Sequence, residues 1–98
     1  MKRLVKKAQR GDKEALMQLV MEAKDEYYRL AFTYMENEHD AMDALENMVV
    51  ILYEKMEQLQ KPESFYSWSK TILVNECRAL LRKRSKIIFL DEEQAATI

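Results

Sequence analysis

The sequence of 98 residues contains one glycine, one proline and one cysteine. Tight turns need glycine and proline, so their scarcity argues against an all-β fold built from many hairpins. A single glycine also excludes a glycine-rich phosphate-binding loop. The lone Cys77 can form no internal disulfide, and we interpret it as a small buried hydrophobic residue. With 48% hydrophobic and 34% charged residues, the composition predicts a single all-α domain.

The sequence also lacks long apolar runs and clusters of reactive side chains. No apolar run approaches the roughly 18 residues of a transmembrane helix, and the N-terminal segment lacks the apolar core of a signal peptide. We therefore expect a cytoplasmic protein without membrane insertion. The only histidine, His39, has no second histidine or cysteine at ligand spacing, so neither a metal site nor another cofactor is expected. Carboxylate pairs such as Asp40 and Asp43 are usually solvated, and we expect no enzymatic activity.

Charge is separated along the chain although the formal net charge is only −1. Residues 1–13 carry six cationic side chains against one carboxylate, and residues 14–63 carry four against twelve. Residues 64–98 carry six against four. Such alternation can serve solubility alone. The alternative is that basic and acidic surfaces bind two different partners.

Hydrophobic periodicity predicts where the first helices lie. Apolar residues spaced by three and four from position 16 to 34 indicate one long helix over about 13–35, capped by Asp12 and preceded by a short helix over 4–9. A second apolar stripe predicts that this long helix packs on two sides. Its members are Met17, Met21, Tyr28, Phe32 and Met35. The segment 37–40 supplies capping residues, and a second long helix should follow it to about residue 59.

The second long helix has an acidic side opposite its apolar side. The apolar side consists of Ala41, Ala44, Leu45, Met48, Val49, Leu52, Met56 and Leu59. The acidic side consists of Asp43, Glu46, Asn47, Val50, Glu54 and Glu57. A valine among carboxylates and an amide is either an ordinary exposed apolar residue or the centre of a contact surface. The sequence leaves both interpretations open.

A loop and a third helix are predicted for the C-terminal part. Pro62 disfavours helical geometry at the residue before it and predicts a loop over 58–64. Ser64 can then cap a helix that ends near Arg84, with core-facing positions at Phe65, Trp68, Ile72, Ala79 and Leu80. Another set, spaced by four, three and four, shares one polar, cationic face: Thr71, Asn75, Arg78 and Arg82. Residues 87–98 show no helical stripe of useful length and are expected to form a linker.

Cations beside aromatic rings are typical of single-stranded nucleic-acid binding, because phosphates meet cations and unpaired bases stack on rings. The residues that could make such contacts are Lys61, Ser64, Tyr66, Trp68 and Lys70 around the start of the third helix, with Arg78, Arg82, Lys83, Arg84 and Lys86 further along it. Phe65 and Trp68 could instead pack in the core. Tyr66 is out of phase with them and is the better candidate for a base contact.

Three segments in this order resemble region two of the extracytoplasmic-function group of bacterial sigma factors: LVKKAQRGDKEAL, DAMDALENMVVILYEKMEQL and SFYSWSKTILVNECRALLRKR. The resemblance spans Leu4 to Lys86 and implies one domain over 1–86, a compact bundle of three to four helices. It implies a domain that binds core RNA polymerase and melts the minus-ten promoter element. The surface docking on the clamp helices of the largest subunit would be Asp43, Glu46, Asn47, Val50 and Glu54. An anti-sigma factor is also an expected partner.

The resemblance further implies how promoter DNA would be bound. The loop over 58–64 would take up a flipped base of the nontemplate strand, and the third helix would read the adjacent duplex. The helix contacts that the resemblance implies would come from Lys70, Thr71, Asn75, Arg78 and Arg82. The family normally carries a second helical domain, so we expect 87–98 to begin the linker to a domain absent from this chain. The alternative is a helical protein-interaction module of the same fold that binds a regulator but not DNA.

Overall fold

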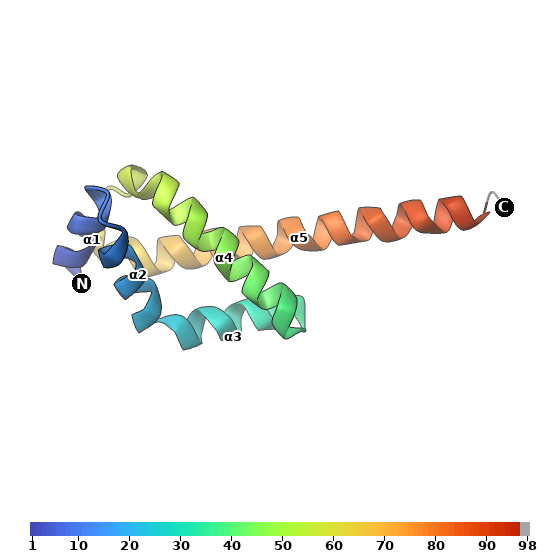
Figure 1. Cartoon of the computed structure of the whole chain (residues 1–98), viewed down its shortest axis with the longest axis horizontal. Helices are drawn as coiled ribbons and strands as arrows, with labels where there is room; N and C mark the ends of the chain where they lie inside the picture. The colour runs from blue at the N-terminus through green and yellow to red at the C-terminus, as the bar shows by residue number, and fades with distance from the viewer. Residues whose placement is uncertain (97–98) are drawn as a thin grey trace.

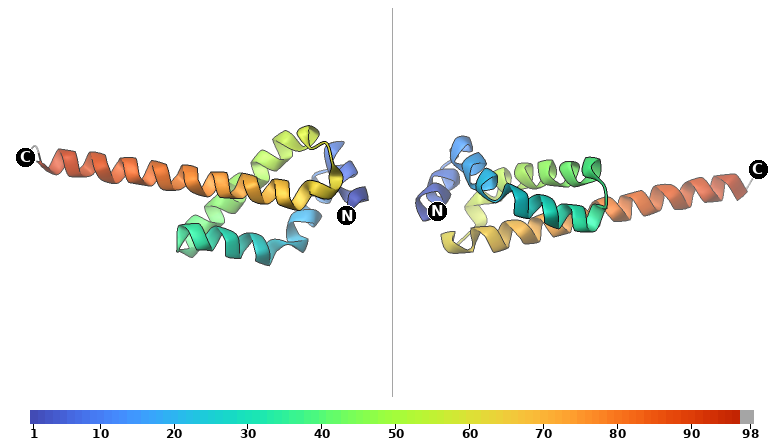
Figure 2. Two further views of the ribbon diagram at one scale, coloured as in Figure 1. Left: turned by 180° about the vertical axis from the view of Figure 1, so that it is seen from behind. Right: turned by 90° about the horizontal axis from the view of Figure 1, so that it is seen from below.

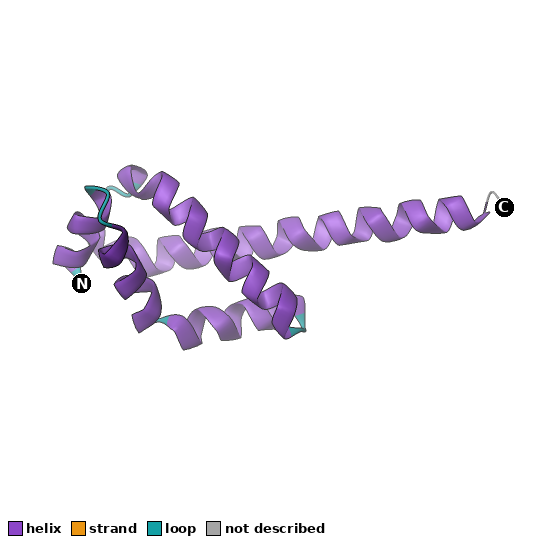
Figure 3. Cartoon of the chain, in the orientation of Figure 1, coloured by secondary structure: helices purple, strands orange, loops and turns teal. Residues whose placement is uncertain are grey.

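The computed structural model describes the backbone of residues 1–96 and the side chains of residues 1–86, and every regular element in this part is helical (Figure 3). The elements are α1 (Lys2–Gln9), α2 (Lys13–Glu22), α3 (Lys24–Met35), α4 (Glu38–Lys55) and α5 (Phe65–Ala96). Two short 3₁₀ helices, η1 (Met56–Gln58) and η2 (Pro62–Ser64), lie between α4 and α5. The predicted all-α fold is confirmed.

The core is formed where α3, α4 and α5 pack against one another. In Figure 1, α4 crosses α5, and α1 with α2 forms a helical pair at the end of the bundle where α5 begins. Figure 2 shows the same arrangement from behind and from below. The first half of α5 is therefore the element against which the other helices are organised, while its second half projects beyond them.

The single long helix predicted over 13–35 is wrong, because the chain forms α2 and α3 with a break at Ala23. Ala23 has φ −111° and ψ 18°, outside the helical region, and is itself buried. The apolar spacing runs through the break because both helices bury the same side of the chain, at Leu19, Ala23 and Tyr27. The break contains neither glycine nor proline, so periodicity alone could not locate it.

The predicted second packing side of this segment is also wrong. Met17, Met21 and Phe32 are 43%, 56% and 42% exposed, respectively, and only Met35 of the predicted stripe is buried. The prediction of Asp12 as a cap is confirmed, since the Ala15 amide donates to Asp12 Oδ1 at 3.1 Å. Of the exposed residues in this stripe, Met21 lines the groove described below.

The chain reverses between α3 and α4 within two residues. Glu36 adopts the left-handed conformation with φ 64°, and Asn37 then caps α4 by accepting the Asp40 amide at Oδ1 at 2.8 Å. The predicted apolar side of α4 is confirmed by the burial of Ala41, Ala44 and Leu52, among others.

α5 buries one residue per turn, at Phe65, Ser69, Leu73 and Cys77. The buried state of Cys77 is confirmed, and burial raises the pKa of its thiol. The other predicted core positions are half-buried and flank this row: Trp68, Ile72, Ala79 and Leu80. Two of the deepest positions, Ser69 and Leu73, are therefore one residue past the predicted Trp68 and Ile72.

The prediction that the third helix ends near Arg84 is wrong, because α5 continues to Ala96. Residues 85–96 contain neither glycine nor proline, and alanine, leucine, glutamate and glutamine favour the helix without any core-facing stripe. The last two residues of the predicted linker, 97 and 98, lie outside the described residues. Within the described part of the chain, no helix is both long and apolar enough to cross a membrane.

Candidate protein and nucleic-acid interfaces

The acidic side of α4 forms one continuous exposed surface. Glu46, Asn47 and Glu54 are exposed and Asp43 is half-buried, while Val50 in their middle is 56% exposed. The positions repeat in steps of three and four, so they share one helix face, opposite buried Ala44 and Met48. We call the five residues Asp43, Glu46, Asn47, Val50 and Glu54 the acidic strip.

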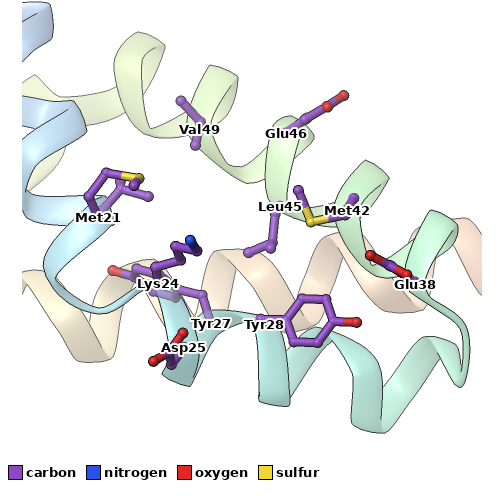
Figure 4. A pocket seen from close by; sticks show the side chains of 11 residues that line it. Met21, Lys24, Asp25, Tyr27, Tyr28, Glu38, Met42, Leu45, Glu46 and Val49 are labelled. Carbon is purple, nitrogen blue, oxygen red and sulfur yellow. The ribbon is translucent and has the colours of Figure 1, made fainter.

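A groove of about 560 Å³ lies next to the acidic strip, between α4 and the α2–α3 segment (Figure 4). The groove has an apolar floor with charged groups at its rim. Its lining residues are Val20, Met21, Lys24, Asp25, Tyr27, Tyr28, Glu38, Met42, Leu45, Glu46 and Val49. Glu46 belongs to both the groove and the strip, so the two form one surface.

The sequence did not reveal this groove because its walls come from three helices. Met21 and Met42 are more than two-fifths exposed and lie on opposite walls. The only feature of the sequence that indicated a groove was the second apolar stripe of residues 13–35. That stripe predicted contact with a further helix, and no helix of the described domain covers most of it. Exposed apolar side chains gathered in one groove are typical of a surface that binds another protein.

The predicted polar face of α5 is present and exposed. Thr71, Asn75, Arg78 and Arg82 all lie at the surface, as does Lys83. Among the described residues, neither Arg78 nor Arg82 forms an ion pair. Their positive charge is therefore available to an external anion such as a phosphate.

Lys70 lies on a different side of α5, facing α3. Its Nζ is 2.8 Å from Glu26 Oε2. The hydrogen bond and the charge of Lys70 lower the pKa of the Glu26 carboxyl. The structure therefore does not bring Lys70 together with Arg78 and Arg82, and its charge is partly neutralised within the domain.

The idea that Tyr66 stands apart from the packed rings is wrong. Its ring contacts Phe65 edge-on, with centroids 5.3 Å apart, and its hydroxyl donates to the Leu19 carbonyl oxygen at 3.2 Å. Burial is the main reason that the pKa of Tyr66 is raised. Trp68 is half-buried against the same Phe65, with ring centroids 6.3 Å apart.

The loop before α5 is tied to the N-terminal helix. Gln9 Nε2 donates to the carbonyl oxygens of Met56 and Leu59, at 3.1 and 2.7 Å. In the loop, Lys61 is exposed and Ser64 is half-buried. Lys61 and Ser64, the two loop residues predicted to contact nucleic acid, thus lie at or near the surface. The start of their segment is held in place by α1.

His39 is exposed, and its Nδ1 lies 3.5 and 3.6 Å from carboxylate oxygens of Asp40 and Asp43. These three groups lie within 4.8 Å of one another. The Asp40 carboxylate already accepts hydrogen bonds from Asn37 Nδ2 and from Arg84. The Asn37 hydrogen bond is the main cause of the lowered pKa of Asp40. The cluster is explained by contacts within the domain, and we assign it no metal.

Comparison with known proteins places the chain among bacterial sigma factors. Residues 19–87 match the family described as Sigma-70 region 2. The RNA polymerase sigma factor SigV of Bacillus subtilis is 33% identical over 87 residues, which cover 89% of this chain and 52% of SigV. The ECF RNA polymerase sigma factor SigW of the same organism is 27% identical over 96 residues, covering 98% of this chain and 51% of SigW.

A third relative comes from another organism. The ECF RNA polymerase sigma factor SigE of Mycolicibacterium smegmatis is 30% identical over 80 residues, which cover 79% of this chain and 31% of SigE. The chain spans about half the length of SigV and SigW. Two of these three relatives are named as ECF sigma factors. Since the family match covers most of the described domain, the chain belongs to the sigma-70 region 2 family.

Proposed function

We propose that this chain is the domain of a bacterial sigma factor that binds core RNA polymerase and helps to open promoter DNA. The observation that supports polymerase binding most directly is the continuous surface of the acidic strip and the apolar groove. A stable protein contact needs an apolar centre with complementary charge around it, and Met42, Val50 and Glu46 supply both. The partner would be the clamp helices of the largest polymerase subunit, and the compartment the cytoplasm.

Promoter binding is proposed for the other charged surface, on α5. Thr71, Asn75, Arg78, Arg82 and Lys83 would contact the minus-ten element, and the loop with Lys61 and Ser64 would receive an unpaired base of the nontemplate strand. Cations that have no carboxylate partner within the described domain can neutralise phosphates and release counterions. Lys70, Tyr66 and Trp68 would act mainly by supporting the start of α5, since their contacts lie within the domain.

The engagement of Lys70 and Tyr66 inside the domain also favours a second candidate. A helical module of this fold could bind a regulator, such as an anti-sigma factor, through the same acidic strip and groove and make no use of DNA. The two candidates share a protein-binding surface and differ only in whether α5 is needed.

Binding to core polymerase tests the shared surface. Glu46→Arg should weaken binding of the chain to purified bacterial core enzyme about tenfold or more, because it reverses charge at the junction of strip and groove. Glu14→Arg makes the same charge change at an exposed position of α2 and should bind like the wild type. Equal binding by both variants would overturn the proposed docking surface.

Opening of DNA separates the two candidates. In the complex with core polymerase, Arg78→Ala with Arg82→Ala should abolish the permanganate reactivity of unpaired thymines on negatively supercoiled promoter DNA while polymerase binding persists. Arg29→Ala with Lys55→Ala removes the same charge from α3 and α4 as a control. Unchanged opening by the α5 variant would favour the regulator-binding module.

A further inference from the structure

α1 carries a cationic face that neither the proposed polymerase surface nor the proposed promoter contacts use. Five exposed cationic side chains occupy this face: Lys2, Arg3, Lys6, Lys7 and Arg10. They share one side because they recur at intervals of four along the helix. The opposite side buries Val5 and Ala8 in the core. We call these five residues the α1 cationic face.

Folding accounts for only part of this face, because Lys6 and Lys7 in the last turn of α1 complement the helix dipole. Lys2 and Arg3 lie in the first turn of α1, which contains no acidic residue, and positive charge there opposes the helix dipole. Among the described residues, none of the five forms an ion pair with a carboxylate. Lys13, the next cation along the chain, differs because its Nζ lies 5.1 Å from the centre of the Tyr53 ring. The charge of the α1 cationic face is therefore directed at an external anion.

The position of α1 identifies the anion. The two hydrogen bonds from Gln9 to the carbonyl oxygens of Met56 and Leu59 hold α1 against the start of the loop that precedes α5. α1 also contacts η2, at the other end of this loop. Figure 2 shows α1 beside the first turns of α5. A strand whose base enters the loop, next to exposed Lys61, would thus reach the α1 cationic face directly.

A membrane surface fits this helix less well. An amphipathic helix binds a bilayer by inserting its free apolar side, whereas the apolar side of α1 is packed in the core at Val5 and Ala8. A phosphate backbone requires only the charges.

We infer that the α1 cationic face binds the phosphates of the single-stranded nontemplate DNA that continues past the loop over 58–64. This inference rests on the proposed DNA-binding function and extends its surface from α5 through the loop to the N-terminus. The helix is about 12 Å long, which gives room for roughly two or three phosphates of an extended strand. Gln9 acts as a positioning residue, since it fixes this face relative to the loop.

The experiment compares oligothymidine strands of about 6 and about 12 nucleotides, because backbone contacts are independent of sequence and site sizes are in this range. The full chain should bind the longer strand more tightly. The double variant Lys6→Gln with Arg10→Gln should bind both strands equally well. For the longer strand, the slope of the logarithm of the binding constant against the logarithm of the salt concentration should become less steep by about 1.4. Between about 50 and 200 mM salt, wild-type affinity should then fall about sevenfold more than that of the variant.

The matched control is Arg29→Gln with Thr33→Glu, which lowers the net charge equally at exposed positions of α3. It should keep the wild-type preference for the longer strand. Circular dichroism of all variants should give the same thermal midpoint, because the four positions are exposed.

Two outcomes separate this inference from the function on which it rests. If the α1 variant binds the longer strand like the wild type, while Arg78→Ala with Arg82→Ala weakens both strands, the inference is wrong and the proposed DNA binding stands. If the wild type binds neither strand, both are wrong. Loss of binding to anionic phospholipid vesicles by the α1 variant, with strand binding unchanged, would overturn the inference in favour of a membrane.

Discussion

At the scale of single residues, Ser69 is the one fully buried polar side chain in the described part of the chain, apart from the tyrosine hydroxyl that it contacts. The Ser69 hydroxyl donates to the Tyr66 carbonyl oxygen at 3.0 Å, so the Tyr27 hydroxyl donates to Ser69 Oγ at 2.7 Å. This bond joins α3 to α5 across 42 positions of sequence. In a core that is otherwise apolar, it specifies which side of α5 faces α3.

The Ser69→Ala variant should show what this bond contributes. It leaves the buried Tyr27 hydroxyl without its partner, and the free energy of unfolding should fall by about 1–3 kcal/mol. Adding Tyr27→Phe removes this unpaired hydroxyl and should restore part of the lost free energy of unfolding. Urea denaturation of the single and double variants measures both effects. A double variant less stable than Ser69→Ala alone would contradict this role.

The same tyrosine predicts a loss of stability at high pH. Burial raises the pKa of Tyr27 to about 12, against a usual value near 10. Between these values the unfolded chain has released a proton that the folded chain retains, so the free energy of unfolding falls as pH rises. Urea midpoints at about pH 9 and about pH 11 should therefore differ less in Tyr27→Phe than in the wild type. An equal pH dependence in both proteins would contradict the assignment.

At the scale of helices, the turn from α3 to α4 combines a favourable cap with a strained residue. Asn37 caps α4, but Glu36 occupies the left-handed region, φ 64°, which suits glycine. The backbone strain at Glu36 is the local cost of placing α4 antiparallel to α3 with so short a connection.

Glu36→Gly should relieve this strain and raise the free energy of unfolding by about 0.5–1 kcal/mol. The same substitution two residues later, Glu38→Gly, lies in α4. It should lower the free energy of unfolding, because glycine disfavours the helical conformation. Thermal denaturation of the two variants provides the comparison. A lower midpoint for Glu36→Gly would indicate that the left-handed conformation does not limit stability.

At the scale of the whole molecule, α5 serves two purposes along its length. Its first half is the centre of the packed domain, and its last turns extend away from the other helices, giving a longest dimension of 60 Å (Figure 1). The Arg84 to Asp40 pair, between α5 and α4, is the last described contact along the helix.

Removal of residues 87–98 should therefore leave the folded domain intact. We expect the thermal midpoint to change by no more than about 2 °C, less than the shift that 1 kcal/mol produces in a domain of this size. Circular dichroism should show fewer helical residues but the same cooperative transition. A drop of about 10 °C would mean that the projecting turns contribute to the core.

The sequence by itself determined the helical class, the buried sides of α2, α3 and α4, and the two charged surfaces on α4 and α5. These features depend on residues three or four positions apart, whose relation within a helix is set by local geometry. The resemblance in the three quoted segments also identified the family. The exposed polar side of α5 at Asn75 and Arg78 could be predicted in this way, as could the acidic strip.

Only the tertiary structure decided the break at Ala23, the groove between α4 and the α2–α3 segment, and the pairing of Lys70 with Glu26. The last two depend on residues far apart in sequence, and the break occurs at a buried alanine that has no local stop signal. The position of α1 beside the loop was likewise decided by Gln9, through hydrogen bonds spanning 47 and 50 positions. Periodicity describes one helix at a time, whereas these features arise from how the helices pack together.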